Sequence, residues 1–216
     1  MLRKLIVLFF PFLLAAAQSL SLSVSPASVY AGSSSTVTAS ITFTDATPSA
    51  NIAGLSWVLG LPAGLTMGVG TVGASGTAAQ KVLTSNGTTS ILIGSDGTGS
   101  SFALNQNAFT TGVIATFPVT VSTSSTPGTA TLNLTTPTAA SAPGALVVIT
   151  ATGATLTILS QYDLNGDGSV TYQDVSIMLT DFLTGSCTGQ AAKVGDGHCN
   201  ISDVQLEIRA ALGLIQ

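Results

Sequence analysis

The segment Val37-Thr38-Ala39-Ser40-Ile41-Thr42-Phe43 alternates apolar and polar side chains. An apolar period of two is typical of a β-strand with one buried face. Similar short stretches, separated by clusters of Gly, Pro, Ser, Thr and Asn, recur along residues 18–160 and predict about ten strands. The others are Leu20–Val24, Leu55–Leu59, Leu65–Val69, Lys81–Thr84, Ile91–Ile93, Val113–Val121, Ala130–Leu134, Ala145–Ile149 and Ala154–Ile158. Because no longer stretch here has a helical period, we expect a mainly β fold, a jelly-roll-like antiparallel β-sandwich.

The first 17 residues have the composition of a secretory signal peptide. Residues 3 and 4 are basic, residues 5–14 are apolar apart from one proline, and residues 15–17 are alanines that provide a small-x-small cleavage pattern. The alternative is a membrane anchor, but residues 5–17 are fewer than the roughly 20 that span a bilayer. We therefore predict an exported protein, secreted or at the cell surface, with no membrane span in the mature chain.

Charge is distributed unevenly along the chain. Residues 18–160 contain only Asp45, Asp96 and Lys81 as charged side chains, whereas residues 161–216 contain seven acidic and two basic ones. This asymmetry predicts a sandwich domain over residues 18–160, called the body below, and a C-terminal module over residues 161–216. Without the signal peptide, nine acidic residues face three basic ones. This balance argues against binding to nucleic acid or to an anionic membrane surface.

The body lacks the residue types that hydrolytic catalysis needs. Its two carboxylates, Asp45 and Asp96, lie in turn-like sequence, and the single histidine of the chain, His198, is in the C-terminal module. We therefore expect neither a pair of carboxylates for glycoside hydrolysis nor a Ser-His-Asp triad. The prediction is a protein that is not an enzyme.

Carbohydrate binding by the body would need exposed aromatic rings. Phe43, Trp57 and Phe117 are in phase with the apolar alternation, which predicts that they are core residues. Three aromatic residues remain: Tyr30, Phe102 and Phe109. They are too few and too scattered to predict a binding platform.

Residues 163–174, with the sequence DLNGDGSVTYQD, fit the twelve-residue calcium-loop template. Calcium prefers six to eight oxygen ligands, and the template takes them from positions 1, 3, 5, 7, 9 and 12. The predicted ligands are Asp163, Asn165, Asp167, the Ser169 carbonyl, Thr171 and Asp174. Gly168 at position 6 permits the sharp turn around the ion. The alternative is an Asx-rich turn without an ion; we predict one bound Ca²⁺.

The calcium loop is followed by a predicted helix and then by a weaker copy of the same pattern. Apolar residues at helical spacing from Val175 to Leu183 predict the helix, and Gly185 ends it. At an offset of 29 residues the pattern recurs, but positions 1 and 3 of the second loop are no longer polar. A second, weaker calcium site is left open, with Asp196, His198, Asn200 and Asp203 as its candidate ligands.

The two cysteines of the chain, Cys187 and Cys199, both lie in the C-terminal module. In an oxidising compartment outside the cell two such thiols can pair, and a disulfide would stabilise a module too small to bury a large core. We predict this disulfide; two free, half-buried thiols are the alternative.

Two loop-helix halves without entering helices, with Asp at both twelfth positions and Gly-Asp-Gly in each loop, resemble a dockerin module over residues 162–213. The resemblance implies a non-catalytic module that folds around calcium and binds a cohesin-type protein partner, commonly in polysaccharide-degrading assemblies. In that family, partner choice depends on loop positions 10 and 11. These are Tyr172 and Gln173 in the first half, and Ile201 and Ser202 in the second.

The body resembles a cohesin-like or carbohydrate-binding-type β-sandwich in its strand and turn order. The residues that carry this resemblance are Ala53–Trp57 followed by Leu61–Leu65, and Gly112–Val121 followed by Pro127–Ala130. The sequence thus predicts a secreted, non-catalytic interaction or scaffold protein with a calcium-dependent docking module. One alternative is a carbohydrate-binding protein with a polysaccharide as its partner. The other is a surface structural protein whose calcium loops only stabilise the fold.

Overall fold

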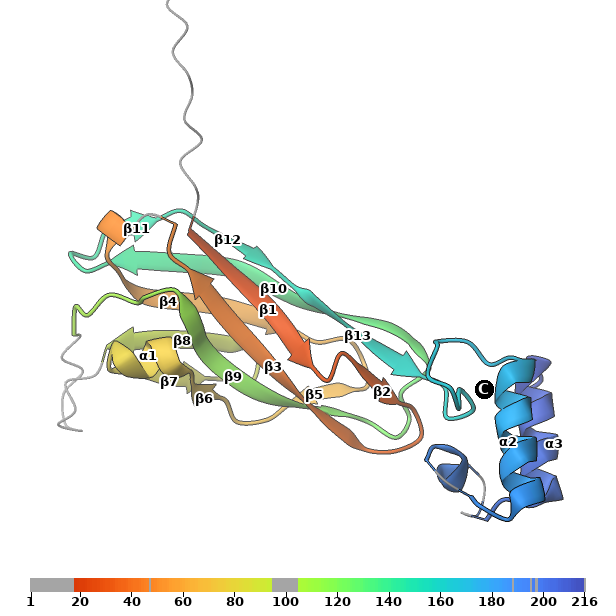
Figure 1. Cartoon of the computed structure of the whole chain (residues 1–216). Helices are drawn as coiled ribbons and strands as arrows, with labels where there is room; N and C mark the ends of the chain where they lie inside the picture. Colours follow the sequence, from red (N-terminus) through yellow and green to blue (C-terminus); the bar gives the residue numbers. More distant parts are fainter. Residues whose placement is uncertain are drawn as a thin grey trace, which may run out of the picture.

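The computed structural model describes residues 18–46, 48–94, 105–187, 189–194, 196 and 198–215. The predicted signal peptide, Asp96 and Phe102 lie outside these residues. The described part is mainly β, with two curled sheets that face each other and a pair of helices beyond one end of the sandwich (Figure 1).

The first sheet contains the segment that predicted the fold. Its strands, in order, are β12 (Ile149–Thr152), β1 (Gln18–Ser25), β3 (Ser35–Thr44), β9 (Gly112–Val121) and β5 (Leu65–Met67), and β6 (Thr71–Val72) also pairs with β9. In β3 the apolar side chains of Val37, Ala39, Ile41 and Phe43 are fully buried, while the residues between them are at least partly exposed. The alternation therefore places one face of β3 on the core and the other toward solvent.

The second sheet supplies the opposite face of the core. Its strands, in order, are β2 (Ser28–Tyr30), β13 (Ala154–Leu159), β10 (Gly128–Ser141), β4 (Ile52–Gly60), β8 (Thr89–Gly94) and β7 (Lys81–Ser85), and β11 (Leu146–Val147) pairs with β10. Trp57 and Leu59 of β4 and Leu132 of β10 are buried in one cluster with the apolar residues of the first sheet. Two short helices, η1 (Pro48–Ala50) and α1 (Ala74–Ala78), complete the body.

The sheets are not wholly antiparallel, which corrects the prediction. β1 pairs in parallel with β12, and β2 pairs in parallel with β13. Residues 18–30 and residues 149–159 each begin in the first sheet and continue in the second, so the two segments run side by side in the same direction. Between β12 and β13 the chain passes close to Leu132, whose carbonyl oxygen leaves no room for a Cβ at Gly153.

The ten predicted strand segments all contribute to strands, with differences at their ends. The segment Ala145–Ile149 is divided between β11 and the start of β12, and β10 is longer than predicted. The strands β2 and β6 and helix α1 were not predicted, because two to five residues are too few to show a period.

Beyond β13 the C-terminal module forms around a pair of helices, α2 (Tyr172–Thr184) and α3 (Ile201–Ala211), with a short turn of helix, η2 (Ala191–Lys193), between them. As predicted, Gly185 ends α2 in the left-handed conformation, with φ of 65°. The module has its own buried cluster, made by Tyr162, Met178, Ala191, Val194, Val204 and Ala210. The main cluster of the body ends at Ile158, but the domain boundary at residue 160 itself stays a prediction.

Candidate metal centre

The first half of the loop 163–174 folds around the carboxylate of Asp163. One carboxylate oxygen, Oδ1, accepts hydrogen bonds from the backbone N–H groups of Gly166 (2.8 Å) and Asp167 (3.1 Å). The other, Oδ2, accepts from the N–H of Gly168 (2.8 Å). Gly166 and Gly168 have φ of 75° and 93°, a backbone region in which glycine carries no steric penalty. Asp163 is consequently almost fully buried, with 1% of its surface exposed.

Asp174 closes the loop from its other end. Its Oδ1 accepts from the N–H groups of Leu164 (2.9 Å) and Asn165 (3.1 Å), and its Oδ2 accepts from the N–H of Thr171 (2.8 Å). Asp174 is also the third residue of α2, and it forms a capping box with Thr171, the residue that caps the helix. Position 12 of the loop therefore links the first turn of α2 to the start of the loop.

The other predicted ligands lie on the outer side of the loop. Asn165, Asp167 and Ser169 are exposed, and the Oδ1 of Asp167 accepts from the N–H of Ser169 (2.9 Å). Among the described residues, no group of three His, Cys, Asp or Glu side chains is arranged to hold a metal ion by itself. The predicted ligand set also contains an amide, a carbonyl and a hydroxyl oxygen, as calcium prefers. The structure brings these residues into one closed loop, while their coordination of an ion stays a prediction.

The negative charges of Asp163 and Asp174 also act on a third acidic residue, Glu207 of α3. Its side chain is fully buried, and neither carboxylate oxygen has a hydrogen-bond partner among the described residues. Burial, together with the negative charges of Asp174 and Asp163, raises the pKa of Glu207 to about 8.

The residues of the second loop are less suited to an ion. Ala192 and Val194 stand at positions 1 and 3, and Val194 is fully buried in the core of the module. Asp203 forms a capping box with Asn200 at the start of α3, and the N–H of His198 donates to Asp196 (3.0 Å). These side chains have local structural roles, and a second calcium ion stays a prediction.

Tyr30 connects the body to the first loop, a contact that the sequence did not indicate. It ends β2, and a Cβ built on Gly166 would lie 3.2 Å from its hydroxyl oxygen. Burial, together with the charges of Asp163 and Asp174, raises the pKa of Tyr30. The loop is therefore positioned at the end of the second sheet.

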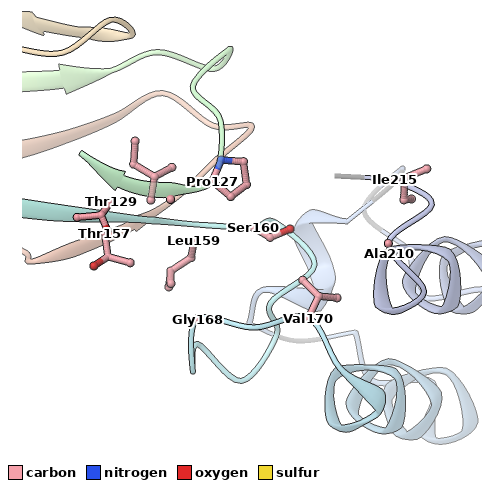
Figure 2. A pocket seen from close by; sticks show the side chains of 12 residues that line it. Pro127, Thr129, Thr157, Leu159, Ser160, Gly168, Val170, Ala210 and Ile215 are labelled. Carbon is pink, nitrogen blue, oxygen red and sulfur yellow. The ribbon is translucent and has the colours of Figure 1, made fainter. Parts of the chain in front are cut away.

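A cleft of about 410 Å³ also lies between the body and the module (Figure 2). It is lined by Pro127, Gly128, Thr129, Thr157, Ile158, Leu159 and Ser160 of the body and by Gly168, Val170, Ala210, Gly213 and Ile215 of the module. None of these lining residues is charged.

The described charged residues of the body have structural environments. Lys81 is buried, and its Nζ donates to Oδ1 of Asn105 (2.8 Å) and lies 5.3 Å from the ring centroid of Phe109. Burial lowers the pKa of Lys81 to about 8. Asp45 accepts a hydrogen bond from Nε2 of Gln18 (2.8 Å). These contacts hold segments of the sandwich together.

The aromatic residues of the body are mostly core. Phe43, Trp57 and Phe117 are buried as predicted, and so is Phe109, which contacts Phe43 edge to face at 6.1 Å. Of the three residues left for carbohydrate stacking, Phe109 is therefore unavailable and Tyr30 lies against the loop 163–174.

Cys187 and Cys199 form a disulfide with a Cα–Cα distance of 5.3 Å. It connects the segment after α2 to the end of the second loop, just before α3.

We expect replacement of both cysteines by serine to lower the free energy of unfolding of the module by about 3 kcal/mol. The disulfide closes a short loop in the unfolded chain, and without it the unfolded chain has more conformations available. Denaturant unfolding with and without a reductant measures this. The reductant should lower the denaturant midpoint of the wild type and leave the midpoint of the double serine variant, the control, unchanged. A wild-type midpoint that the reductant does not change would contradict the prediction.

Comparisons with solved structures find cohesins. A non-cellulosomal cohesin from the archaeon Archaeoglobus fulgidus is 16% identical, with 68% of this chain and 94% of that chain covered and a TM-score of 0.48. The sixth cohesin of scaffoldin B from Acetivibrio cellulolyticus, in complex with a Cel5 dockerin, is 18% identical (66% and 99% covered, TM-score 0.47). A type I cohesin–dockerin complex from Clostridium thermocellum contains a chain that is 14% identical (67% and 94% covered, TM-score 0.48).

These values describe a likeness in the arrangement of strands and are no ground for assigning a function. No protein-family model matches the sequence. No curated protein matches it either. Within the described residues, no helix is long and apolar enough to cross a membrane.

Proposed function

We propose that the protein is a secreted, non-catalytic interaction protein whose C-terminal module folds around calcium and docks onto a protein partner. The feature that carries this proposal is a pair of exposed apolar rows, one on each helix, which we call the docking face. Its residues are Tyr172, Leu179 and Leu183 of α2, Ile201 and Ile208 of α3, and Leu212, which directly follows α3. Each is between 41% and 76% exposed.

The docking face follows from the internal repeat. Each of its α2 residues corresponds to one of its α3 residues at the offset of 29. In an α-helix, residues separated by seven and eleven positions lie on the same side, so each row is continuous. Large apolar side chains that stay exposed at equivalent positions of both halves favour contact with a partner.

The partner we propose is a cohesin-type protein, in the setting of an extracellular polysaccharide-degrading assembly. The first turns of the two helices carry different side chains, Tyr172 and Gln173 in α2 but Ile201 and Ser202 in α3. A partner that used both halves interchangeably would meet two different surfaces. We therefore propose one preferred orientation of binding.

Calcium dependence rests on the loop. Asp163 and Asp174 are buried together with Glu207, and the two groups that act most strongly on Glu207 are both acidic. A bound cation would offset this repulsion, and it would position Tyr172 and Gln173, which directly follow position 9 of the loop.

Two of the alternatives place binding in the body, and a third gives the loop a purely structural role. A cohesin-like body would have the opposite role and take a dockerin-type partner, as the cohesins in two of the similar structures do. Carbohydrate stacking has lost support, because four of the six aromatic residues of the body are buried. A purely structural role for the calcium loop leaves the exposed rows of α2 and α3 without an explanation.

We expect the replacement of Tyr172 and Ile201 by alanine to weaken binding to a cohesin-type partner by about 30-fold or more, as loss of an interface hot spot does. Titration calorimetry of the full mature chain against a panel of purified cohesins, with and without calcium, measures this. Val69→Ala truncates an even more exposed apolar residue of the body and should have no effect. Binding of a dockerin-type module without calcium, unaffected by the double substitution, would instead place the function in the body.

A further inference from the structure

Lys81 is the only basic residue of the body, and its side chain is 5% exposed. It begins β7, the strand at one edge of the second sheet. Burial alone lowers its pKa to about 8, so no carboxylate among the described residues compensates its charge. A buried lysine of this kind loses its proton more readily than an exposed one, and the neutral amine is a nucleophile.

The group next to this amine is the side-chain amide of Asn105. Nζ of Lys81 lies 2.8 Å from Oδ1 of Asn105 and 3.3 Å from the backbone carbonyl oxygen of the same residue. Because a C=O bond is about 1.2 Å long, the amide carbon Cγ lies roughly 3 to 4 Å from Nζ. The ring of Phe109, itself 2% exposed, has its centroid 5.3 Å from Nζ. The amine and the amide carbon are therefore close to the separation at which groups react, beside an apolar ring.

Hydrogen bonds hold the amide of Asn105 in this orientation. Its Oδ1 also accepts from the backbone N–H of Asn107 (3.3 Å), and its Nδ2 donates to the carbonyl oxygen of Gln80 (2.8 Å). A donor on Oδ1 polarises the carbonyl and stabilises the negative charge that develops there when a nucleophile attacks Cγ. Since Gln80 directly precedes Lys81, the same stretch of backbone positions the amine and the nitrogen atom that would leave.

We propose that Lys81 and Asn105 react with each other in the folded protein and form an isopeptide bond. The neutral Nζ attacks Cγ, the Nζ–Cγ bond forms and the Cγ–Nδ2 bond breaks. One proton of the amine is transferred to Nδ2, which leaves as ammonia, so the step needs no oxidant, reductant or further reactant. The bond links the edge strand β7 to a residue 24 positions further along the chain. It is independent of calcium binding and of docking.

Tryptic digestion of the denatured and reduced mature chain, followed by mass spectrometry, tests the proposal. The mature sequence has three cleavage sites, after Lys81, Lys193 and Arg209. Trypsin does not cut after a lysine whose amine is part of an amide. We therefore expect residues 18–193 as one peptide, lighter by one ammonia, with fragment ions that join Lys81 to Asn105. Cyclisation of a terminal glutamine at residue 18 also releases ammonia, but it leaves the site after Lys81 open to trypsin.

Three variants assign the bond. Lys81→Arg keeps a positive charge and Asn105→Ala removes the amide; in both we expect cleavage after position 81 and no loss of ammonia from residues 82–193. Asn107→Ala removes a neighbouring amide, which donates to Oε1 of Gln80 (3.0 Å), but keeps the backbone N–H, and it should retain the bond. A hydrogen bond alone does not survive denaturation, so wild-type protein that yields separate peptides 18–81 and 82–193 would overturn the proposal. Resistance to trypsin that persists in Asn105→Ala would overturn it as well.

Discussion

Removal of calcium at about pH 8 is expected to unfold the C-terminal module, residues 161–216, and to leave the sandwich folded. The two parts have separate buried clusters, and the cluster of the module is the smaller one. A site of roughly micromolar affinity in roughly millimolar calcium contributes about 4 kcal/mol to the folded state by mass action. This is comparable to the whole stability of a small domain.

Two spectroscopic signals report separately on the two parts. The helical signal in far-ultraviolet circular dichroism comes chiefly from α2 and α3, because α1 and the two 3₁₀ turns are short. The fluorescence of the single tryptophan, Trp57, reports on the sandwich, where its side chain is 1% exposed. We expect a chelator to abolish most of the helical signal while the emission of Trp57 stays unchanged.

Asp163→Ala should reproduce the effect of the chelator even in excess calcium. It removes the predicted ligand at position 1 and the acceptor for the N–H groups of Gly166, Asp167 and Gly168. Asp181→Asn serves as the control within the same module. A helical signal that responded neither to the chelator nor to Asp163→Ala would mean that the loop is stable without an ion.

The sequence predicted the sandwich because the alternation of β3 and β4 directly encodes which side chains are buried. Alternation does not encode which strands are neighbours. The parallel pairs, β1 with β12 and β2 with β13, arise from two segments about 130 residues apart that change sheets together. Phe109 shows the same limit, because it lies outside any regular strand and is nevertheless buried against Phe43.

The candidate site was predicted to the extent that it is local. The twelve residues of the loop carry their own spacing, and the structure closes them between Asp163 and Asp174. Tyr30 and Glu207 come from the body and from the other half of the module, and no local pattern connects them to the loop. A comparison of the two halves at the offset of 29 offered one signal, the acidic residue opposite Met178.

In the absence of calcium, the stability of the module is expected to fall as the pH rises from about 5 to about 8. Burial and the charges of Asp174 and Asp163 raise the pKa of Glu207 in the folded state to about 8, from the ordinary value of 4.5 for a glutamate side chain. Between these two values the folded state holds a proton that the unfolded state has released. The folded form is therefore favoured at low pH, and it loses up to about 1.4 kcal/mol per pH unit as the pH rises.

Thermal and denaturant unfolding at several pH values, followed by the helical signal, measures this dependence. The buffer should be freed of calcium on a chelating resin, because soluble chelators weaken at low pH. We expect Glu207→Gln to abolish most of the loss of stability with rising pH, since the amide does not titrate. We expect calcium to reduce the same loss in the wild type, since the ion favours the ionised carboxylate. If the variant and the wild type lost stability equally with rising pH, another group would be responsible. If calcium left the wild-type slope unchanged, Glu207 would not be coupled to the bound ion.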